Sequence, residues 1–242
     1  MKKETFIVII LIITFMKACQ YFEKEATIPS KPNNTIYVSE ADISKGVDRV
    51  KNQNKFYNLM IGLHPEIEQE LSKVLKQKFG NRAVNIETVN LDGLLDEMPI
   101  FTDIFFRYMI KAPDEEFFHS FYVEYDHMKK NGSCKAAIPS PEDAKETAEA
   151  KYNLVMAARE RPYTFKPVSD KEMERIMTKV IKNYAKKGYN IANLKAFLTN
   201  GGRYLSEFER CQTQIHFFEI LLSLPKKESV TVLRVTLGDS LK

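Results

Sequence analysis

The stretch "SPEDAKETAEAKYNLVMAARE" at residues 140–160 decides the fold class of this chain. Ser140 is a residue type that caps helix N-termini, and Pro141 suits the first helical position, where its missing N–H leaves no backbone bond unmade. Behind them, small and apolar residues recur every three or four positions, at Ala144, Ala148, Tyr152 and Val155. This stretch therefore predicts a long helix with one packed face.

Segments on both sides repeat this combination of a start signal, a helical period and a stop. The expected helices cover residues 39–63, 65–79, 113–130, 169–188 and 190–199. Residues 86–97 predict a weaker and shorter helix. The stretch "PIFTDIFFRYMIKA" at residues 99–112 is apolar nearly all round, which is typical of a central buried helix.

The clearest periodic pattern lies near the C-terminus, where apolar residues are spaced four, three, four, three and four positions apart. They are Tyr204, Phe208, Cys211, Ile215, Phe218 and Leu222. A heptad-like stripe of this kind predicts one long helix. Because the stripe is too short for an autonomous coiled coil, we expect it to pack inside the domain.

The stretch "SVTVLRVTL" at residues 229–237 is rich in β-branched residues, which favours a strand. A lone strand, however, would have no pairing partner in a helical domain. We therefore predict an all-α, compact multi-helix domain of seven to nine helices, with one short C-terminal strand left as an open alternative.

The N-terminus carries an uninterrupted apolar run, "TFIVIILIITFM", at residues 5–16. A helix of this length covers roughly 18 Å at about 1.5 Å per residue. The hydrocarbon core of a bilayer is roughly 30 Å thick, so the run is short for a transmembrane span. Preceded by Lys2 and Lys3, it is typical of a secretory signal peptide.

The stretch "MKAC" at residues 16–19 follows this run. It resembles the lipobox of bacterial lipoprotein precursors, although Met16 stands where leucine is usual and Lys17 is an uncommon neighbour. The resemblance covers residues 1–19 and implies cleavage before Cys19 and lipidation of that cysteine. Plain secretion and an uncleaved short anchor are the alternatives. Residues 20–38 are polar and contain Pro29 and Pro32, which is typical of a tether.

The expected organisation is a signal peptide at residues 1–18, a lipidated cysteine and flexible tether at residues 19–38, and a helical domain at residues 39–242. The chain has 36 basic and 32 acidic residues, for a formal net charge of +4. Removing residues 1–18 leaves 33 basic and 31 acidic residues, so part of the excess belongs to the signal peptide. A nucleic-acid partner would require a concentrated basic face, and we expect no such partner.

Two cysteines remain once Cys19 is set aside. In an exported chain, Cys134 and Cys211 predict one disulfide. The alternative is that Cys211, on the apolar stripe, is a buried free thiol.

Two Glu-x-x-His patterns supply the candidate metal ligands Glu116, His119, Glu124 and His127. Two bundle helices with this pattern form the di-iron site of ferritin-like proteins. Here both copies lie on one expected helix, eight residues apart, which gives an offset of about 80° and a rise of about 12 Å. Both copies cannot bind one metal ion, so we expect no metal and interpret these residues as the polar face of an amphipathic helix.

Motifs for catalysis are missing from the sequence. It contains no Gly-x-Ser-x-Gly, and "NGGR" at residues 200–203 follows an expected helix rather than a strand, as a phosphate loop would. We therefore expect no cofactor, and an enzymatic function is disfavoured.

The leading functional hypothesis is a membrane-anchored extracytoplasmic lipoprotein that acts as a protein-binding or envelope-assembly module. One alternative is a periplasmic immunity protein that neutralises a toxin. Another is a metal-binding helical enzyme or storage module that uses the Glu-x-x-His pairs. The expected location is the cell envelope, periplasmic or surface-facing. Gln20 after Cys19 is not an aspartate-type inner-membrane retention signal, which slightly favours the outer membrane.

Overall fold

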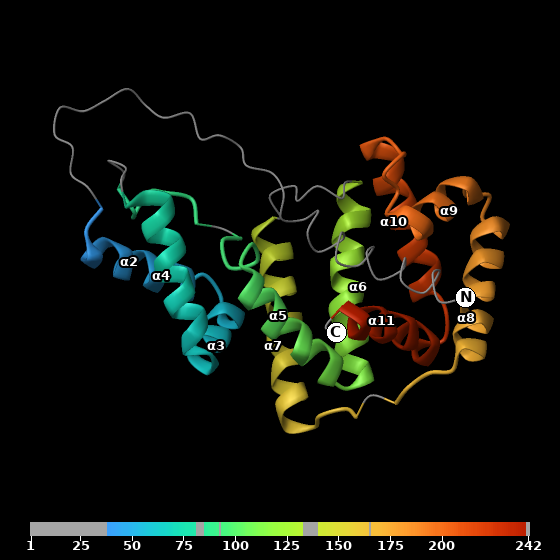
Figure 1. The fold of residues 1–242 in the computed structure, drawn as a ribbon, viewed down its shortest axis with the longest axis horizontal. Helices are drawn as coiled ribbons and strands as arrows, with labels where there is room; N and C mark the ends of the chain where they lie inside the picture. The colour runs from blue at the N-terminus through green and yellow to red at the C-terminus, as the bar shows by residue number, and fades with distance from the viewer. Residues whose placement is uncertain (1–37, 81–84, 92, 133–139, 165, 241–242) are drawn as a thin grey trace. The chain divides into compact units, whose positions relative to one another are not determined.

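The computed structural model describes residues 38–80, 85–91, 93–132, 140–164 and 166–240. These residues form ten α-helices and no strand, which confirms the predicted all-α class and slightly exceeds the predicted number of helices (Figure 1). In chain order they are α2 (Glu40–Lys51), α3 (Lys55–Leu63), α4 (Pro65–Phe79), α5 (Pro99–Lys111), α6 (Asp114–Asn131), α7 (Pro141–Glu160), α8 (Asp170–Lys186), α9 (Ile191–Asn200), α10 (Glu207–Leu222) and α11 (Lys226–Ser240).

The chain divides into two compact units, and the division falls inside α5, between Ile104 and Phe105. The predicted central helix is thus shared between the units. It is not buried all round, because Asp103 and Arg107 are exposed on it. In the part of the chain that the structure describes, no helix combines the length and the apolar character needed to cross a bilayer.

The first unit is built on α2, α3 and α4, which pack against one another. The buried face of α4 carries Ile67, Leu71 and Leu75 at helical spacing, and all three side chains are fully buried. Gly46 lets α2 approach this face, because a Cβ at that position would lie 3.1 Å from Leu75 and from Ile86. Each helix in this unit therefore contributes one stripe to a shared apolar core.

The prediction of a short helix at residues 86–97 is wrong, because the described part of this segment forms a series of turns. Its apolar residues Ile86, Leu91, Leu94 and Leu95 are buried, so the pattern reflected burial and not a helical period. The guanidinium of Arg49 donates to the carbonyl oxygens of Ile86 and Val89. A side chain from α2 thus satisfies backbone groups that a helix would have paired internally.

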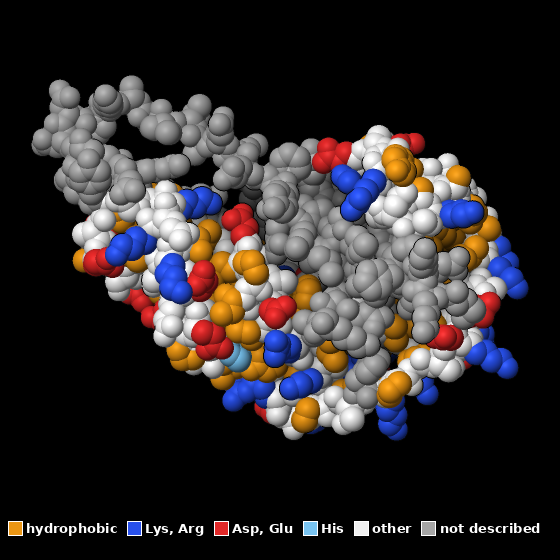
Figure 2. Space-filling model, viewed as in Figure 1, with side chains coloured by type: hydrophobic (Ala, Val, Ile, Leu, Met, Phe, Trp, Pro, Cys, Tyr) orange, Lys and Arg blue, Asp and Glu red, His pale blue; other side chains and the backbone are white. Residues whose placement is uncertain are grey.

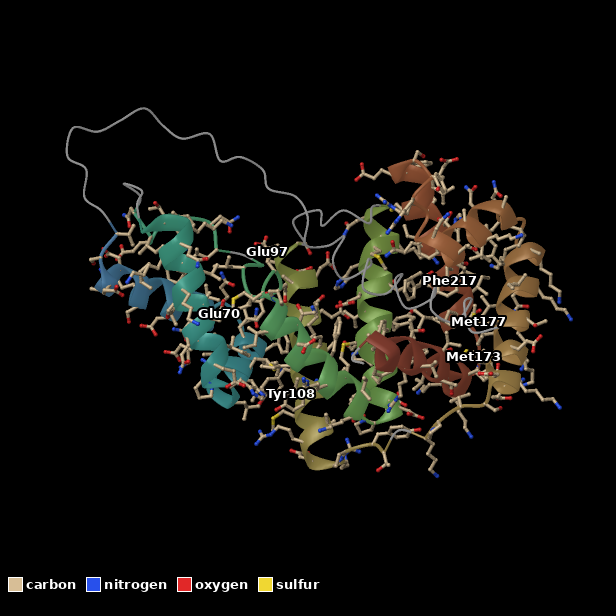
Figure 3. All side chains as sticks on the ribbon, viewed as in Figure 1. Glu70, Glu97, Tyr108, Met173, Met177 and Phe217 are labelled. Atoms are coloured by element: carbon tan, nitrogen blue, oxygen red, sulfur yellow. The ribbon has the colours of Figure 1, made fainter. Side chains whose placement is uncertain are left out.

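The second unit has α6 at its centre, in contact with α7, α10 and α11 (Figure 1). The predicted helix at residues 141–160 is confirmed as α7, and Ser140 caps it by accepting from the backbone N–H of Asp143. On the other side of the unit, α8 packs against α10 and α11. Met173 and Met177 lie on the side of α8 that faces these helices, near Phe217 of α10 (Figure 3).

The long stripe predicted for residues 204–222 is confirmed only in its C-terminal part. Ile215 and Phe218 are buried, but Tyr204 and Phe208 are 88% and 71% exposed. Helix α10 begins at Glu207, with a capping box at Ser206, so Tyr204 lies outside it. Gly201 and Gly202 both have positive φ and end the preceding helix, and the turn that follows them extends to the cap at Ser206. Tyr204 therefore lies in this turn and does not share the helical spacing of α10.

The alternative prediction of a C-terminal strand at residues 229–237 is wrong, because this segment lies within helix α11. Measured β propensities of the amino acids differ by only about 1 kcal/mol, so the packing of the segment against neighbouring helices outweighs them. Val230, Leu233 and Leu237 recur at helical spacing and are buried. As a helix, the segment satisfies its own backbone and needs no partner strand.

Arg234 of α11 is the largest fully buried side chain in the described residues, with 1% of its surface exposed. Its Nη1 donates to the carbonyl oxygen of Ile110 at 3.0 Å, and its Nη2 donates to that of Ala112 at 2.6 Å. The backbone N–H of Tyr163 donates to the intervening carbonyl, that of Lys111, at 2.7 Å. Three successive carbonyl groups at the C-terminal end of α5, which a helix leaves unpaired, are thus satisfied.

The charge of Arg234 is balanced within the same arrangement. Its Nη2 lies 2.9 Å from Oδ1 of Asp114, at the start of α6. The guanidinium also lies over two aromatic rings, 3.8 Å from the centroid of Tyr163 and 4.8 Å from that of Phe117. One side chain therefore joins the end of α5, the start of α6 and the segment after α7.

Candidate functional site

Of the three cysteines to which the sequence assigns roles, the structure describes only Cys211. Cys19 and Cys134 lie outside the described residues. Cys211 lies in the N-terminal half of α10 and is partly exposed. Lipidation of Cys19 and pairing of Cys134 with Cys211 therefore stay predictions.

The disulfide prediction has a measurable consequence for stability. A bridge between Cys134 and Cys211 closes a loop of about 78 residues, for which the chain-entropy model gives about 4 to 5 kcal/mol. We expect the double substitution Cys134→Ser, Cys211→Ser to lower the free energy of unfolding in urea by about this amount. Reduction of the wild-type chain should have the same effect, and Cys19→Ser should not. Alkylation of both thiols in the unreduced, denatured chain would contradict the bridge.

The four Glu-x-x-His residues lie on α6 in different surroundings. Glu116 pairs with Arg161 at 2.6 Å, and Glu124 pairs with Lys151 at 3.2 Å. His119 is exposed, whereas His127 is buried against α7. Two of the proposed ligands thus have cationic partners, and His127 has a different set of neighbours from the other three.

The side chain of His127 contacts three residues in the first two turns of α7. Its Nε2 lies 3.2 Å from Oδ1 of Asp143 and 3.1 Å from Oε2 of Glu146. Its Nδ1 lies 3.1 Å from Oγ1 of Thr147. The sequence pattern groups His127 with Glu124 of its own helix and assigns no role to Asp143 or Glu146. The one available signal was His127 on the preceding helix, which could have been matched with the acidic residues at the start of α7.

A second polar cluster joins the end of α8 to α10. The rings of Tyr189 and His216 stack with centroids 3.8 Å apart and planes 2° apart. The hydroxyl of Tyr189 donates to Oε2 of Glu219 at 2.9 Å, and Nζ of Lys187 lies 3.5 Å from the same carboxylate. Burial raises the pKa of Tyr189 to about 12, and burial lowers the pKa of His216 below its usual value. At neutral pH these groups form a neutral stacked pair with one ionised carboxylate, an arrangement suited to fixing a loop on a helix.

Two large side chains stand out from the surface at the start of α10. Tyr204 and Phe208 are the most exposed of the large hydrophobic residues in the described part of the chain. Their backbone is held in place, because the capping box at Ser206 fixes the helix start and the backbone N–H of Leu205 donates to the carbonyl oxygen of Gly202 at 2.9 Å. Figure 2 shows hydrophobic side chains at this end of α10 with basic side chains beside them.

Comparisons of the chain with protein-family models, with curated proteins and with solved structures find no match.

Proposed function

We propose that this protein is a lipoprotein of the cell envelope, anchored through Cys19, whose helical part binds another protein. The short apolar run at residues 5–16 and the lipobox-like "MKAC" support the anchor. An acylated tether concentrates the helical part at one membrane surface. This arrangement suits a binding or assembly partner, and the chain carries no recognisable catalytic motif that would favour an enzyme.

The observation that carries the binding proposal is the exposure of Tyr204 and Phe208 on a constrained backbone. Burying a Phe side chain in a partner contributes about 1.5 to 3 kcal/mol. Tyr and Arg are enriched among the residues that dominate binding energy, and the exposed Arg203 adjoins Tyr204. Because the turn and the capped helix already hold these residues, little conformational entropy would be lost on binding.

The binding surface can be tested by site-specific photo-crosslinking in cells that express the full chain. A benzoylphenylalanine at position 204 or 208 should form one discrete adduct with another protein. The control is position 181, because Ile181 is 42% exposed on α8 and lies outside this surface. No adduct from 204 or 208, or the same adducts from 181, would contradict the proposal.

A second experiment measures how much the Phe208 side chain contributes to the free energy of binding. Phe208→Ala should weaken binding of the captured partner about 30-fold, which corresponds to about 2 kcal/mol at a dominant contact. The identity of the adduct separates the two kinds of binder: an imported toxin would support the immunity alternative, and an envelope component would support an assembly role.

A further inference from the structure

Three potential ligand atoms from two helices converge on one point at the α6–α7 contact. They are Nε2 of His127 on α6, and one carboxylate oxygen each from Asp143 and Glu146 on α7, all within 4.8 Å of one another. Asp143 and Glu146 are three residues apart, so a helix places them on the same face. His127 is 9% exposed and cannot leave the cluster without opening the helix contact.

The hydrogen bond on the other side of the imidazole determines what Nε2 can do. In the tautomer in which Nδ1 donates to Oγ1 of Thr147, at 3.1 Å, Nε2 presents a lone pair to the two carboxylates. Three acceptors then face one another, and a cation placed among them would be bound by all three. Histidine ligands of metal ions are usually oriented in this manner, by a hydrogen bond from the second ring nitrogen.

The separations fit a small divalent cation. Zn²⁺ binds imidazole nitrogen and carboxylate oxygen at about 2.0 to 2.2 Å, which in a tetrahedron places neighbouring ligand atoms about 3.3 Å apart. The distances from Nε2 to the two carboxylate oxygens are 3.2 Å and 3.1 Å. The third separation, between the two carboxylate oxygens, is at most 4.8 Å. The cluster can therefore take such an ion once the exposed Glu146 side chain adjusts its position.

The surroundings hold the ligands and leave one side open. The second carboxylate oxygen of Asp143 accepts from the hydroxyl of Ser140 at 2.8 Å, which orients the first oxygen toward His127. The nearby cation Lys130 pairs with Asp126 at 2.6 Å, so its ammonium group is already engaged. The Glu146 side chain is 55% exposed, which leaves room for water in a fourth coordination position.

We propose that His127, Asp143 and Glu146 bind one Zn²⁺ or similar first-row divalent cation, with Thr147 orienting the imidazole. The site is independent of the proposed protein-binding surface at Tyr204 and Phe208. An imidazole and two carboxylates with an open position suit these ions, whereas a thiolate-rich set would favour a closed structural site.

The test uses the purified, detergent-solubilised full chain after removal of metal with a chelator. Titration calorimetry with ZnCl₂, together with elemental analysis after dialysis, should give one zinc per chain. Glu146→Gln should weaken binding by 100-fold or more, and Thr147→Val should weaken it about 10- to 100-fold, as expected for a group that orients a ligand. Added zinc should raise the melting temperature of the wild-type chain and not that of Glu146→Gln.

Matched controls separate this site from adventitious binding. Glu142→Gln removes the same charge from an exposed position in the same helix start, and His119→Asn removes an exposed imidazole from α6. Both should bind zinc like the wild type. Because Glu146 is largely exposed, its substitution should leave the fold intact, which circular dichroism checks.

Three results would overturn the proposal. The first is less than about 0.2 zinc per wild-type chain, which would leave the cluster as a hydrogen-bonded contact between α6 and α7 without a metal. The second is unchanged affinity in Glu146→Gln. The third is equal loss of binding in Glu142→Gln or His119→Asn.

Discussion

Replacing Arg234 with alanine is expected to lower the free energy of unfolding by about 3 to 5 kcal/mol, because each carbonyl group left without its donor costs about 1 to 3 kcal/mol and the lost side chain leaves a cavity. The ion pair with Asp114 adds little, because the Asp114 side chain is 43% exposed. The substitution removes the donors to the carbonyl oxygen of Ala112, which is buried, and to that of Ile110, which is partly buried. It also removes the guanidinium from between Tyr163 and Phe117 and leaves a cavity there.

Two further variants show which property of Arg234 matters. Arg234→Lys keeps the positive charge but cannot reach both carbonyl oxygens with one planar group, so it should recover only part of the loss. Arg175→Ala is the matched control. Arg175 is an exposed arginine that pairs with Glu172 at 2.7 Å and Glu228 at 2.8 Å. Exposed pairs contribute about 0 to 1 kcal/mol. Glu172 is exposed, and Glu228 keeps its contact with Lys179 at 2.6 Å, so this control should change stability little.

The measurement is urea unfolding followed by circular dichroism, with hydrogen exchange of the α6 and α11 amides as a local probe. Exchange is needed because the two units of the chain can unfold in separate transitions. If Arg234→Ala destabilises the chain no more than Arg175→Ala, the network around Arg234 does not hold these helices together.

Replacing Cys19 with serine is expected to abolish acylation of the chain. Each methylene inserted in a bilayer contributes about 0.8 kcal/mol, so the two or three acyl chains of a lipoprotein give effectively permanent attachment. The lipobox resemblance implies that the mature N-terminus is the modified cysteine itself. A serine offers no thiol for the lipid, so residues 1–18 should also remain on the Cys19→Ser chain.

Mass spectrometry of the N-terminal peptide and labelling with radioactive palmitate test this prediction. The wild-type peptide should begin at Cys19 and carry acyl mass, and Cys134→Ser should label like the wild type. An intact Met1, or a new N-terminus without acyl mass, would contradict both the anchor and the proposed location. The crosslinking experiment at Tyr204 and Phe208 would remain a separate test of protein binding.

Local sequence signals predicted well wherever one segment contained everything it needed. The helix at residues 141–160 has its cap, its first-turn proline and its buried stripe within one stretch, and the structure places α7 there. The prediction failed where a distant group replaced a local one. At residues 86–97 Arg49 satisfies part of the backbone. At residues 229–237 a side-chain preference for strands lost to packing on neighbouring helices.

The candidate sites were less accessible to prediction than the fold. The sequence pattern singled out His127 but paired it with residues of its own helix, whereas Asp143 and Glu146 meet it from α7. Nothing local marked Tyr204 and Phe208 as exposed, because their spacing matched a buried stripe. An arginine inside the apolar run of residues 229–237 was the one sign that Arg234 has a special environment.

The amino-acid sequence by itself determined the all-α class and most of the helix starts, because capping, first-turn proline and the helical period act between residues a few positions apart. Only the tertiary structure decided which polar groups meet. Arg234 reaches Ile110 and Ala112 across more than a hundred residues, and His127 reaches Glu146 across a helix junction. Such contacts depend on how helices pack, and packing is set by the summed burial of many side chains and not by any one segment.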